Sequence, residues 1–155
     1  MNAYRLKPMA FPWPPMLYTA AIAGAFGLGR LIDLSMPART QLMVSGFILL
    51  ALALALMLWS MKSKIDAHVS PFGLRKRPTL MTTGPYRFTR NPIYLGYTLA
   101  TIAAGLLSAN PWFLLGALTA AIVTTQIAIR REEMLLLARY GIDYERYCRQ
   151  VRRWL

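Results

Sequence analysis

Acidic side chains, cysteine and histidine are scarce in this sequence of 155 residues. It holds 18 Lys and Arg against six Asp and Glu, with Cys148 as its single cysteine and His68 as its single histidine. One cysteine cannot form an internal bridge, which excludes a disulfide-stapled secreted module. One histidine and one cysteine also provide no His/Cys cluster, so we expect no metal site. His68 lies in the amphipathic linker Lys62–Phe72 and is expected at the surface.

The chain contains long stretches with little or no charge, and 56% of its residues are hydrophobic. A helix rises about 1.5 Å per residue, so each stretch is suited to crossing a hydrocarbon layer about 30 Å thick. This pattern excludes a water-soluble globule and a disordered tail. It predicts an all-α, polytopic membrane protein with one domain, residues 1–155, and four transmembrane helices. These are Met16–Leu31, Gln41–Met61, Pro92–Ala109 and Pro111–Ile129.

Local signals refine this arrangement. Proline breaks helical hydrogen bonding, so the Pro-rich segment Phe11–Pro15 is expected to lie at the interface, with Trp13 and Tyr18 at headgroup depth. Asn110-Pro111 is a turn signal that makes the third and fourth spans a tight hairpin. Beyond the membrane, Met134–Tyr140 is predicted to continue the fourth helix. Gly141 then ends it as a C-cap, and Asp143 opens a last cytoplasmic helix.

The basic residues orient the chain. Sixteen Lys and Arg lie in the N-terminus, in the segment Lys62–Asn91 and in the tail from Arg130, whereas Arg30 and Arg39 face the other side. Cytoplasmic loops of membrane proteins carry such an excess, so both termini and the active site are expected in the cytoplasm. The positive charge is then a topology signal and an attraction to anionic headgroups, and no nucleic-acid partner is expected.

Polar residues suited to chemistry gather at the two cytoplasmic ends of the predicted hairpin. In the first segment Asn91 precedes Pro92, a pattern typical of an N-cap, and the helix start beside Arg87 and Arg90 suits an anionic group. Tyr86 and Tyr94 offer aromatic faces for a purine or a sulfonium. A capped helix with interfacial tyrosines and snorkelling arginines explains the same residues equally well.

The second segment begins with Glu132 and Glu133, where the fourth helix leaves the membrane. A carboxylate facing the other end of the hairpin is suited to holding an ammonium or a ribose hydroxyl, although a surface ion pair with Arg130 or Arg131 is the alternative. Further on, Tyr144, Tyr147 and Val151 form a stripe that would fold over the hairpin mouth, a pattern more typical of packing than of catalysis.

Taken together, several motifs resemble the isoprenylcysteine carboxyl methyltransferase and phospholipid methyltransferase family. They are Thr79–Tyr86, Arg90–Gly96, Glu132-Glu133, Gly141, Tyr144, Tyr147 and Val151–Trp154, and the resemblance covers Pro78 to Leu155. It implies an integral membrane methyltransferase that uses S-adenosylmethionine in a pocket at the cytoplasmic face, formed by residues 78–155, with a lateral opening for lipophilic acceptors. The cofactor-binding residues that it implies are Pro78, Thr79, Leu80, Met81, Tyr86, Arg90, Asn91, Pro92, Ile93, Tyr94, Gly96 and Glu132.

This chain departs from the family pattern at two positions. Asn91 stands where the family commonly has histidine. Carboxyl methyltransferases of the family carry an arginine one helical turn before the glutamate, whereas Ala128 is found here. Prenylcysteine carboxyl methylation is therefore disfavoured, and a lipid amine, a thiol or another small lipophilic nucleophile is the expected acceptor. The catalytic candidates are Arg130, Arg131 and Glu133.

Two other functions stay open at this point. A membrane reductase that binds NADPH would share the C-terminal half of the fold. Alternatively, a non-catalytic accessory protein would use the polar hairpin mouth to bind a partner. Titration with S-adenosylhomocysteine and with NADPH separates the three possibilities.

Overall fold

The computed structural model describes residues 13–34, 36–68 and 80–155, and every regular element within them is helical. This confirms the predicted all-α class. The elements in chain order are α1 (Trp13–Leu31), α2 (Arg39–His68), the 3₁₀ turn η2 (Gly84–Arg87), α3 (Pro92–Ser108), α4 (Trp112–Thr124), the π turn η3 (Thr125–Ile129), α5 (Arg130–Tyr140) and α6 (Ile142–Gln150).

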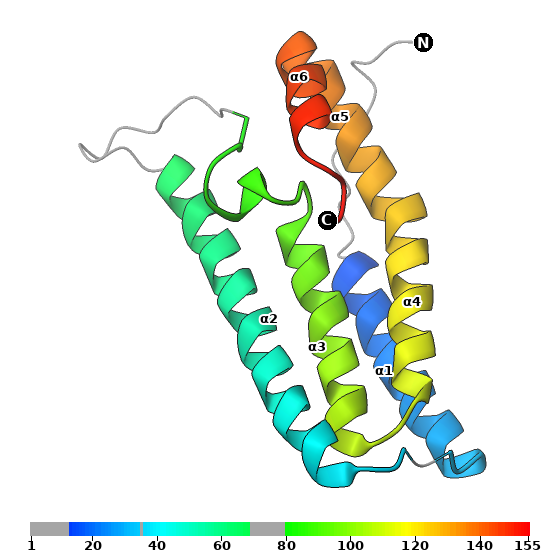
Figure 1. The fold of residues 1–155 in the computed structure, drawn as a ribbon. Helices are drawn as coiled ribbons and strands as arrows, with labels where there is room; N and C mark the ends of the chain where they lie inside the picture. The colour runs from blue at the N-terminus through cyan, green and yellow to red at the C-terminus, as the bar shows by residue number, and fades with distance from the viewer. Residues whose placement is uncertain (1–12, 35, 69–79) are drawn as a thin grey trace.

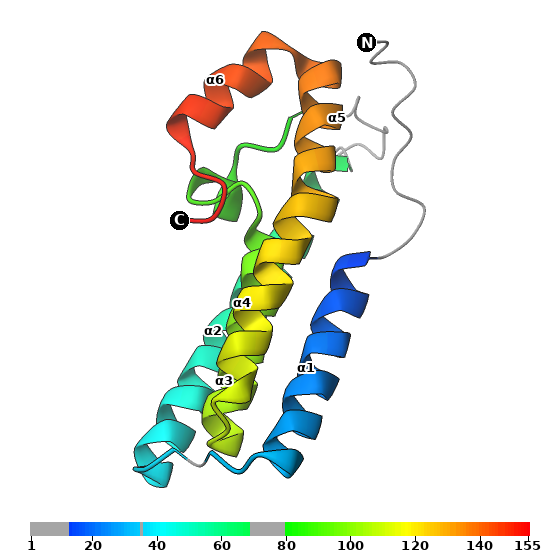
Figure 2. The same ribbon diagram turned by 90° about the vertical axis from the view of Figure 1, so that its right-hand side faces the viewer.

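Helices α1 to α4 run alongside one another, with α3 packed against both α2 and α4, and α1 against α4 (Figures 1 and 2). The predicted hairpin is confirmed. Ala109 adopts a left-handed conformation with φ 50°, and the Asn110 side chain accepts a bond from the Trp112 N–H at 3.0 Å. Helix α5 extends the direction of α4 past the other helices, and α6 turns back over the start of α3.

Helix α1 begins earlier than predicted. Trp13, Pro14 and Pro15 form its first turn, where the missing proline N–H would have no partner in any case, so the expected non-helical segment is wrong for these residues. Phe11 and Pro12 lie outside the described residues. Tyr18 is 3% exposed, and its hydroxyl lies 2.6 Å from Thr98 Oγ1 of α3. Tyr18 therefore packs between helices, and its expected position at headgroup depth stays a prediction.

Two helices within the described ranges are long and apolar enough to cross a membrane: Arg39–Asp66 of α2 and the continuous helix Trp112–Tyr140. Only 11% of the most apolar window of α2 is buried, and Phe47, Leu52 and Leu58 are exposed on its surface. An apolar helix face without a protein partner is suited to lipid contact. Helix α3 is apolar but shorter, so a four-helix crossing and its orientation stay predictions.

Helices α2 and α3 pack closely at Gly96, because a Cβ there would collide with the Met57 side chain. At the other end of the molecule, Gly141 joins α5 to α6 with φ 53°, which confirms the predicted C-cap. The last helix opens at Ile142 and has Asp143 inside its first turn, so Asp143 is not the cap that the sequence suggested.

Candidate active site

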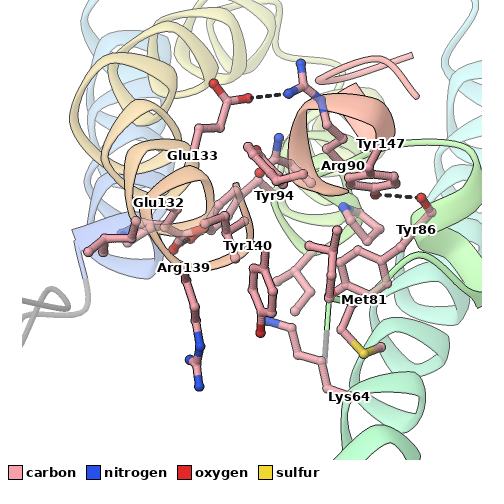
Figure 3. A pocket seen from close by; sticks show the side chains of 18 of the residues that line it. Lys64, Met81, Tyr86, Arg90, Tyr94, Glu132, Glu133, Arg139, Tyr140 and Tyr147 are labelled. Carbon is pink, nitrogen blue, oxygen red and sulfur yellow. Dashed lines mark hydrogen bonds and ion pairs between the residues drawn. The ribbon is translucent and has the colours of Figure 1, made fainter. Parts of the chain in front are cut away.

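A cavity of about 600 Å³ lies where α5, α6 and the segment before α3 meet (Figure 3). Its walls come from six parts of the chain, which bring together tyrosines, charged side chains and apolar side chains. They are Pro14 and Pro15; Lys64; Leu80, Met81, Tyr86, Arg90 and Asn91; Pro92, Ile93, Tyr94 and Tyr97; Glu132, Glu133, Leu135, Leu136, Arg139 and Tyr140; and Tyr144 and Tyr147.

One hydrogen bond joins the two segments that the sequence placed at the hairpin mouth. The Tyr94 hydroxyl donates to Glu132 Oε1 at 2.6 Å, from the first turn of α3 to the first turn of α5. The predicted convergence of these two segments is confirmed. Glu132 thereby presents a carboxylate inside a cavity whose walls also carry Lys64, Arg90 and Arg139, so groups of both charges surround the same space.

Helix α5 turns one face toward this cavity. Glu132, Leu135, Leu136, Arg139 and Tyr140 are spaced i, i+3, i+4, i+7 and i+8, which places them on one side of a helix. The sequence interpretation recognised only Glu132 of this set. The spacing itself was the available signal, because α5 continues a helix that was already predicted. By contrast, nothing in the sequence indicated that Lys64 of α2 and the prolines of α1 would reach the same cavity.

Helix α5 is joined to α4 by the wide turn η3. There the Arg130 N–H bonds to the Thr125 carbonyl, five residues back, and such π turns occur frequently at functional sites. Ala128, at the position where carboxyl methyltransferases of the family carry an arginine, therefore lies inside this irregular turn. Ala128 is fully buried, so this position offers no side chain to the cavity.

Glu133 points away from Glu132 toward two arginines. Its carboxylate lies 3.1 Å from Arg90 Nη1, and it accepts bonds from Arg153 Nε at 2.9 Å and Arg153 Nη2 at 2.6 Å. This bidentate contact with Glu133 raises the pKa of Arg153. Both the Arg90 and the Glu133 side chains are largely buried, with 15% and 17% exposed. Glu133 is therefore part of the cavity wall, with its charge compensated by arginines from distant parts of the chain.

The other catalytic candidates lie farther from this cavity. Arg130 is exposed and lines a second cavity on the far side of Glu133, and Arg131 lines neither of the two. Within the described residues, no three His, Cys, Asp or Glu side chains gather as they would around a metal ion.

Asn91 occupies the N-cap position of α3, but its side chain makes no capping bond. Its amide instead donates to the Arg153 carbonyl at 2.9 Å, so the predicted side-chain cap is wrong. The Arg153 carbonyl also accepts a bond from the Thr89 hydroxyl at 3.2 Å. The neighbouring Arg152 carbonyl accepts a bond from the Arg90 N–H at 3.0 Å. Residues 152–153 thus hold the turn that leads into α3, a contact that the sequence did not indicate.

Tyrosines form much of the remaining wall. The Tyr147 hydroxyl donates to the Tyr86 carbonyl at 2.7 Å, which fixes α6 over the turn η2 and confirms that the stripe from α6 covers the hairpin mouth. Burial raises the pKa of Tyr147 to about 12, and burial also raises the pKa values of Tyr86 and Tyr144. These phenols are therefore neutral at physiological pH, and the Tyr147 hydroxyl acts as a hydrogen-bond donor.

Most of the residues implied by the family resemblance line the cavity. They are Leu80, Met81, Tyr86, Arg90, Asn91, Pro92, Ile93, Tyr94 and Glu132. Gly96 does not, because it faces Met57 of α2. Pro78 and Thr79 lie outside the described residues, and the side chain of His68 is not described either.

A family model described as phospholipid methyltransferase matches residues 42–143, which include Tyr94 and Glu132. A protein of Haemophilus influenzae (strain ATCC 51907 / DSM 11121 / KW20 / Rd), described as an uncharacterized protein, is 38% identical over 63 residues. This similarity covers 41% of the present chain and all of the Haemophilus protein. No solved structure matches the chain.

Proposed function

The chain belongs to the phospholipid methyltransferase family, and from this premise we propose that it is an integral membrane methyltransferase dependent on S-adenosylmethionine. The methyl acceptor is a lipophilic or small nucleophile, such as a lipid amine or a thiol. The observation that carries the proposal is the Tyr94–Glu132 bond, which joins, in the lining of one cavity, the two segments that resemble the cofactor site of the family.

The chemistry of the lining suits this cofactor. Its volume of about 600 Å³ lies in the range of small-molecule sites. Glu132 offers an acceptor for an ammonium or ribose hydroxyl, and Lys64 and Arg139 offer positive charge for a carboxylate. The faces of Tyr86 and Tyr94 suit a purine ring and a sulfonium. When bound, S-adenosylmethionine supplies an electrophilic methyl group.

The protein's own contribution is to position the reactants and exclude water. Ile93, Leu135 and Leu136 form an apolar part of the cavity wall. The Tyr147–Tyr86 bond holds α6 over the cavity. Holding an acceptor in line with a bound methyl group accounts for a large share of such a rate acceleration. The cavity lies at the end of the apolar helices, and the positive charge around it supports a position on the cytoplasmic side, where the bilayer would supply lipophilic acceptors.

Calorimetric titration of the purified chain tests the proposal. We expect S-adenosylhomocysteine to bind and Glu132→Ala to weaken that binding by about tenfold or more, about 1.4 kcal/mol, because the cavity loses its acceptor carboxylate. Asp143→Ala is the matched control, since it removes an exposed acid that does not line the cavity, and it should leave the affinity unchanged.

Each other outcome identifies a different function. Binding of NADPH without S-adenosylhomocysteine indicates the reductase, and binding of neither indicates the accessory protein. Where S-adenosylhomocysteine binds, a methyl-transfer screen with labelled cofactor against phospholipid amines, prenylcysteine analogues and small thiols identifies the acceptor.

A further inference from the structure

A second cavity, of about 640 Å³, lies between α5 and α6 on the other side of the Arg90–Glu133 ion pair. Arg90, Glu133 and Tyr144 line both cavities, so they form a common wall. The full lining is Arg90, Arg130, Glu133, Met134, Leu137, Tyr144, Glu145, Cys148, Arg149 and Arg153.

The charges around this cavity do not balance. Four arginines face two glutamates, and one glutamate, Glu133, is already shared by Arg90 and Arg153. Arg130 and Arg149 are exposed, and neither makes an ion pair with any residue that the structure describes. Glu145 is the remaining acid, four residues before Arg149, so the excess positive charge lies at Arg130 of α5 and Arg149 of α6.

Apolar side chains lie directly beside these arginines. Arg130, Met134 and Leu137 are spaced i, i+4 and i+7, so they share one face of α5. Met134 is 46% and Leu137 is 42% exposed, because both face this cavity rather than the protein interior. Arg130 immediately follows the apolar stretch 111–129, so this mixed surface lies where the long helix emerges from its most apolar part.

We propose that the second cavity binds an anionic phospholipid, with the phosphate held between Arg130 and Arg149 and the acyl chains against Met134 and Leu137. Guanidinium groups match phosphate oxygens with paired hydrogen bonds. A free anion would use the arginines but gain nothing from the exposed apolar side chains, whereas a lipid uses both. This site does not depend on methyl transfer in the first cavity.

Titration of the detergent-purified full chain with dihexanoyl phosphatidylglycerol tests this site. We expect saturable binding, measured by calorimetry, that Arg130→Gln combined with Arg149→Gln weakens by about tenfold or more. Arg30→Gln combined with Arg146→Gln removes the same charge from exposed arginines that line neither cavity, and it should bind as the unchanged protein does. The thermal unfolding midpoint of both variants should stay unchanged, because all four arginines are exposed.

Two comparison ligands separate the sources of the phosphate. Inorganic phosphate and dihexanoyl phosphatidylcholine should bind much more weakly than phosphatidylglycerol. If inorganic phosphate binds as tightly, the site takes a free anion and the lipid assignment is wrong. If phosphatidylcholine binds as tightly, or if the two double variants lose affinity equally, the cavity does not select an anionic lipid and the proposal is overturned.

Discussion

Glu132 and Glu133 are adjacent in the sequence, yet the helix directs them to different partners. Glu132 accepts a bond from Tyr94 inside the cavity, whereas Glu133 lies between Arg90 and Arg153 in its wall. Successive residues of a helix point about 100° apart, so one pair of acids can serve both a ligand and the structure around it. The two carboxylates should therefore respond differently to mutation.

Replacing Glu133 by glutamine should destabilise the protein. The change leaves two arginines without their buried counter-charge, a situation that costs about 3 kcal/mol or more. For a chain of this size this corresponds to a fall of about 6–12 °C in the thermal unfolding midpoint, measured in detergent. Glu145→Gln is the control, because Glu145 is exposed and should shift the midpoint little. Equal small shifts in both variants would contradict a structural role for the Glu133 ion pairs.

Replacing Asn91 by alanine should cost about 1 kcal/mol of unfolding free energy, because one buried hydrogen bond to the Arg153 carbonyl is lost. Asn91→Ser gives the discriminating comparison. Serine is a good N-cap but is too short to replace an amide that reaches the tail, so we expect it to be as destabilising as alanine. Recovery of stability by serine would support the capping role that the structure does not show.

At this scale the sequence allowed some contacts to be predicted and not others. Tyr94 and Glu132 were predicted to lie close together, because in a helical hairpin with a two-residue turn the two helix ends away from the turn lie side by side. The partners of Glu133 and Asn91 could not be found in this way. Arg153 lies in the irregular tail after α6, and the path of such a tail is set by packing rather than by any local pattern.

Among the elements, η3 controls how α5 meets the cavity. A π turn holds one residue more than an α turn, so helical spacing counted along α4 does not carry over into α5. The sequence gives no pattern from which this turn could be predicted, because Thr125–Ile129 reads as ordinary helix. The continuous helix and its length were nevertheless predictable from its apolar composition.

Deleting Gln126 tests the role of this wide turn. Because the turn contains one extra residue, the deletion should convert it to an α turn and leave Glu132 facing the cavity, with S-adenosylhomocysteine affinity retained. Gln126 is exposed, so little packing is lost. Deleting both Gln126 and Ile127 should turn α5 by about 100° and abolish binding. Circular dichroism checks that helix content is kept, and a loss of binding in both variants would refute this account.

The start of α1 illustrates a limit of local signals. Two consecutive prolines indicated a break, but at the first turn of a helix proline is tolerated, and the position of that turn depends on how α1 packs. Tyr18 fixes this packing by its bond to Thr98. Helix α2 also extends past its apolar part to His68, because residues such as Lys62 and Lys64 favour helix once one has formed.

For the whole molecule, the long apolar stretches predicted the all-α class, and the Asn110-Pro111 turn signal predicted the hairpin. The positions of the polar segments predicted the end at which the cavity lies. Two of the four predicted membrane spans meet the length and hydropathy of a crossing helix within the described residues. The orientation rests on the distribution of Lys and Arg and is open to direct measurement.

We expect opposite ends of the molecule to be labelled from opposite sides of the membrane. In a Cys148→Ser background, Asp33→Cys places one exposed thiol near Asn110 of the hairpin turn. Arg146→Cys places one on α6, the helix that covers the first cavity. A membrane-impermeant maleimide added to spheroplasts should label position 33 at once and position 146 only after permeabilisation. The reverse pattern would invert the proposed topology, and labelling of both would argue against a crossing.

The contacts of residues 152–154 have a consequence for how the protein is made. The Arg152 and Arg153 carbonyls hold the turn before α3, and the Trp154 indole N–H donates to Thr125 at 3.2 Å. A ribosome releases these residues after all the helices described above, so insertion of the helices into a bilayer can precede completion of the cavity. A released chain truncated after Gln150 should therefore be membrane-inserted but unable to retain S-adenosylhomocysteine.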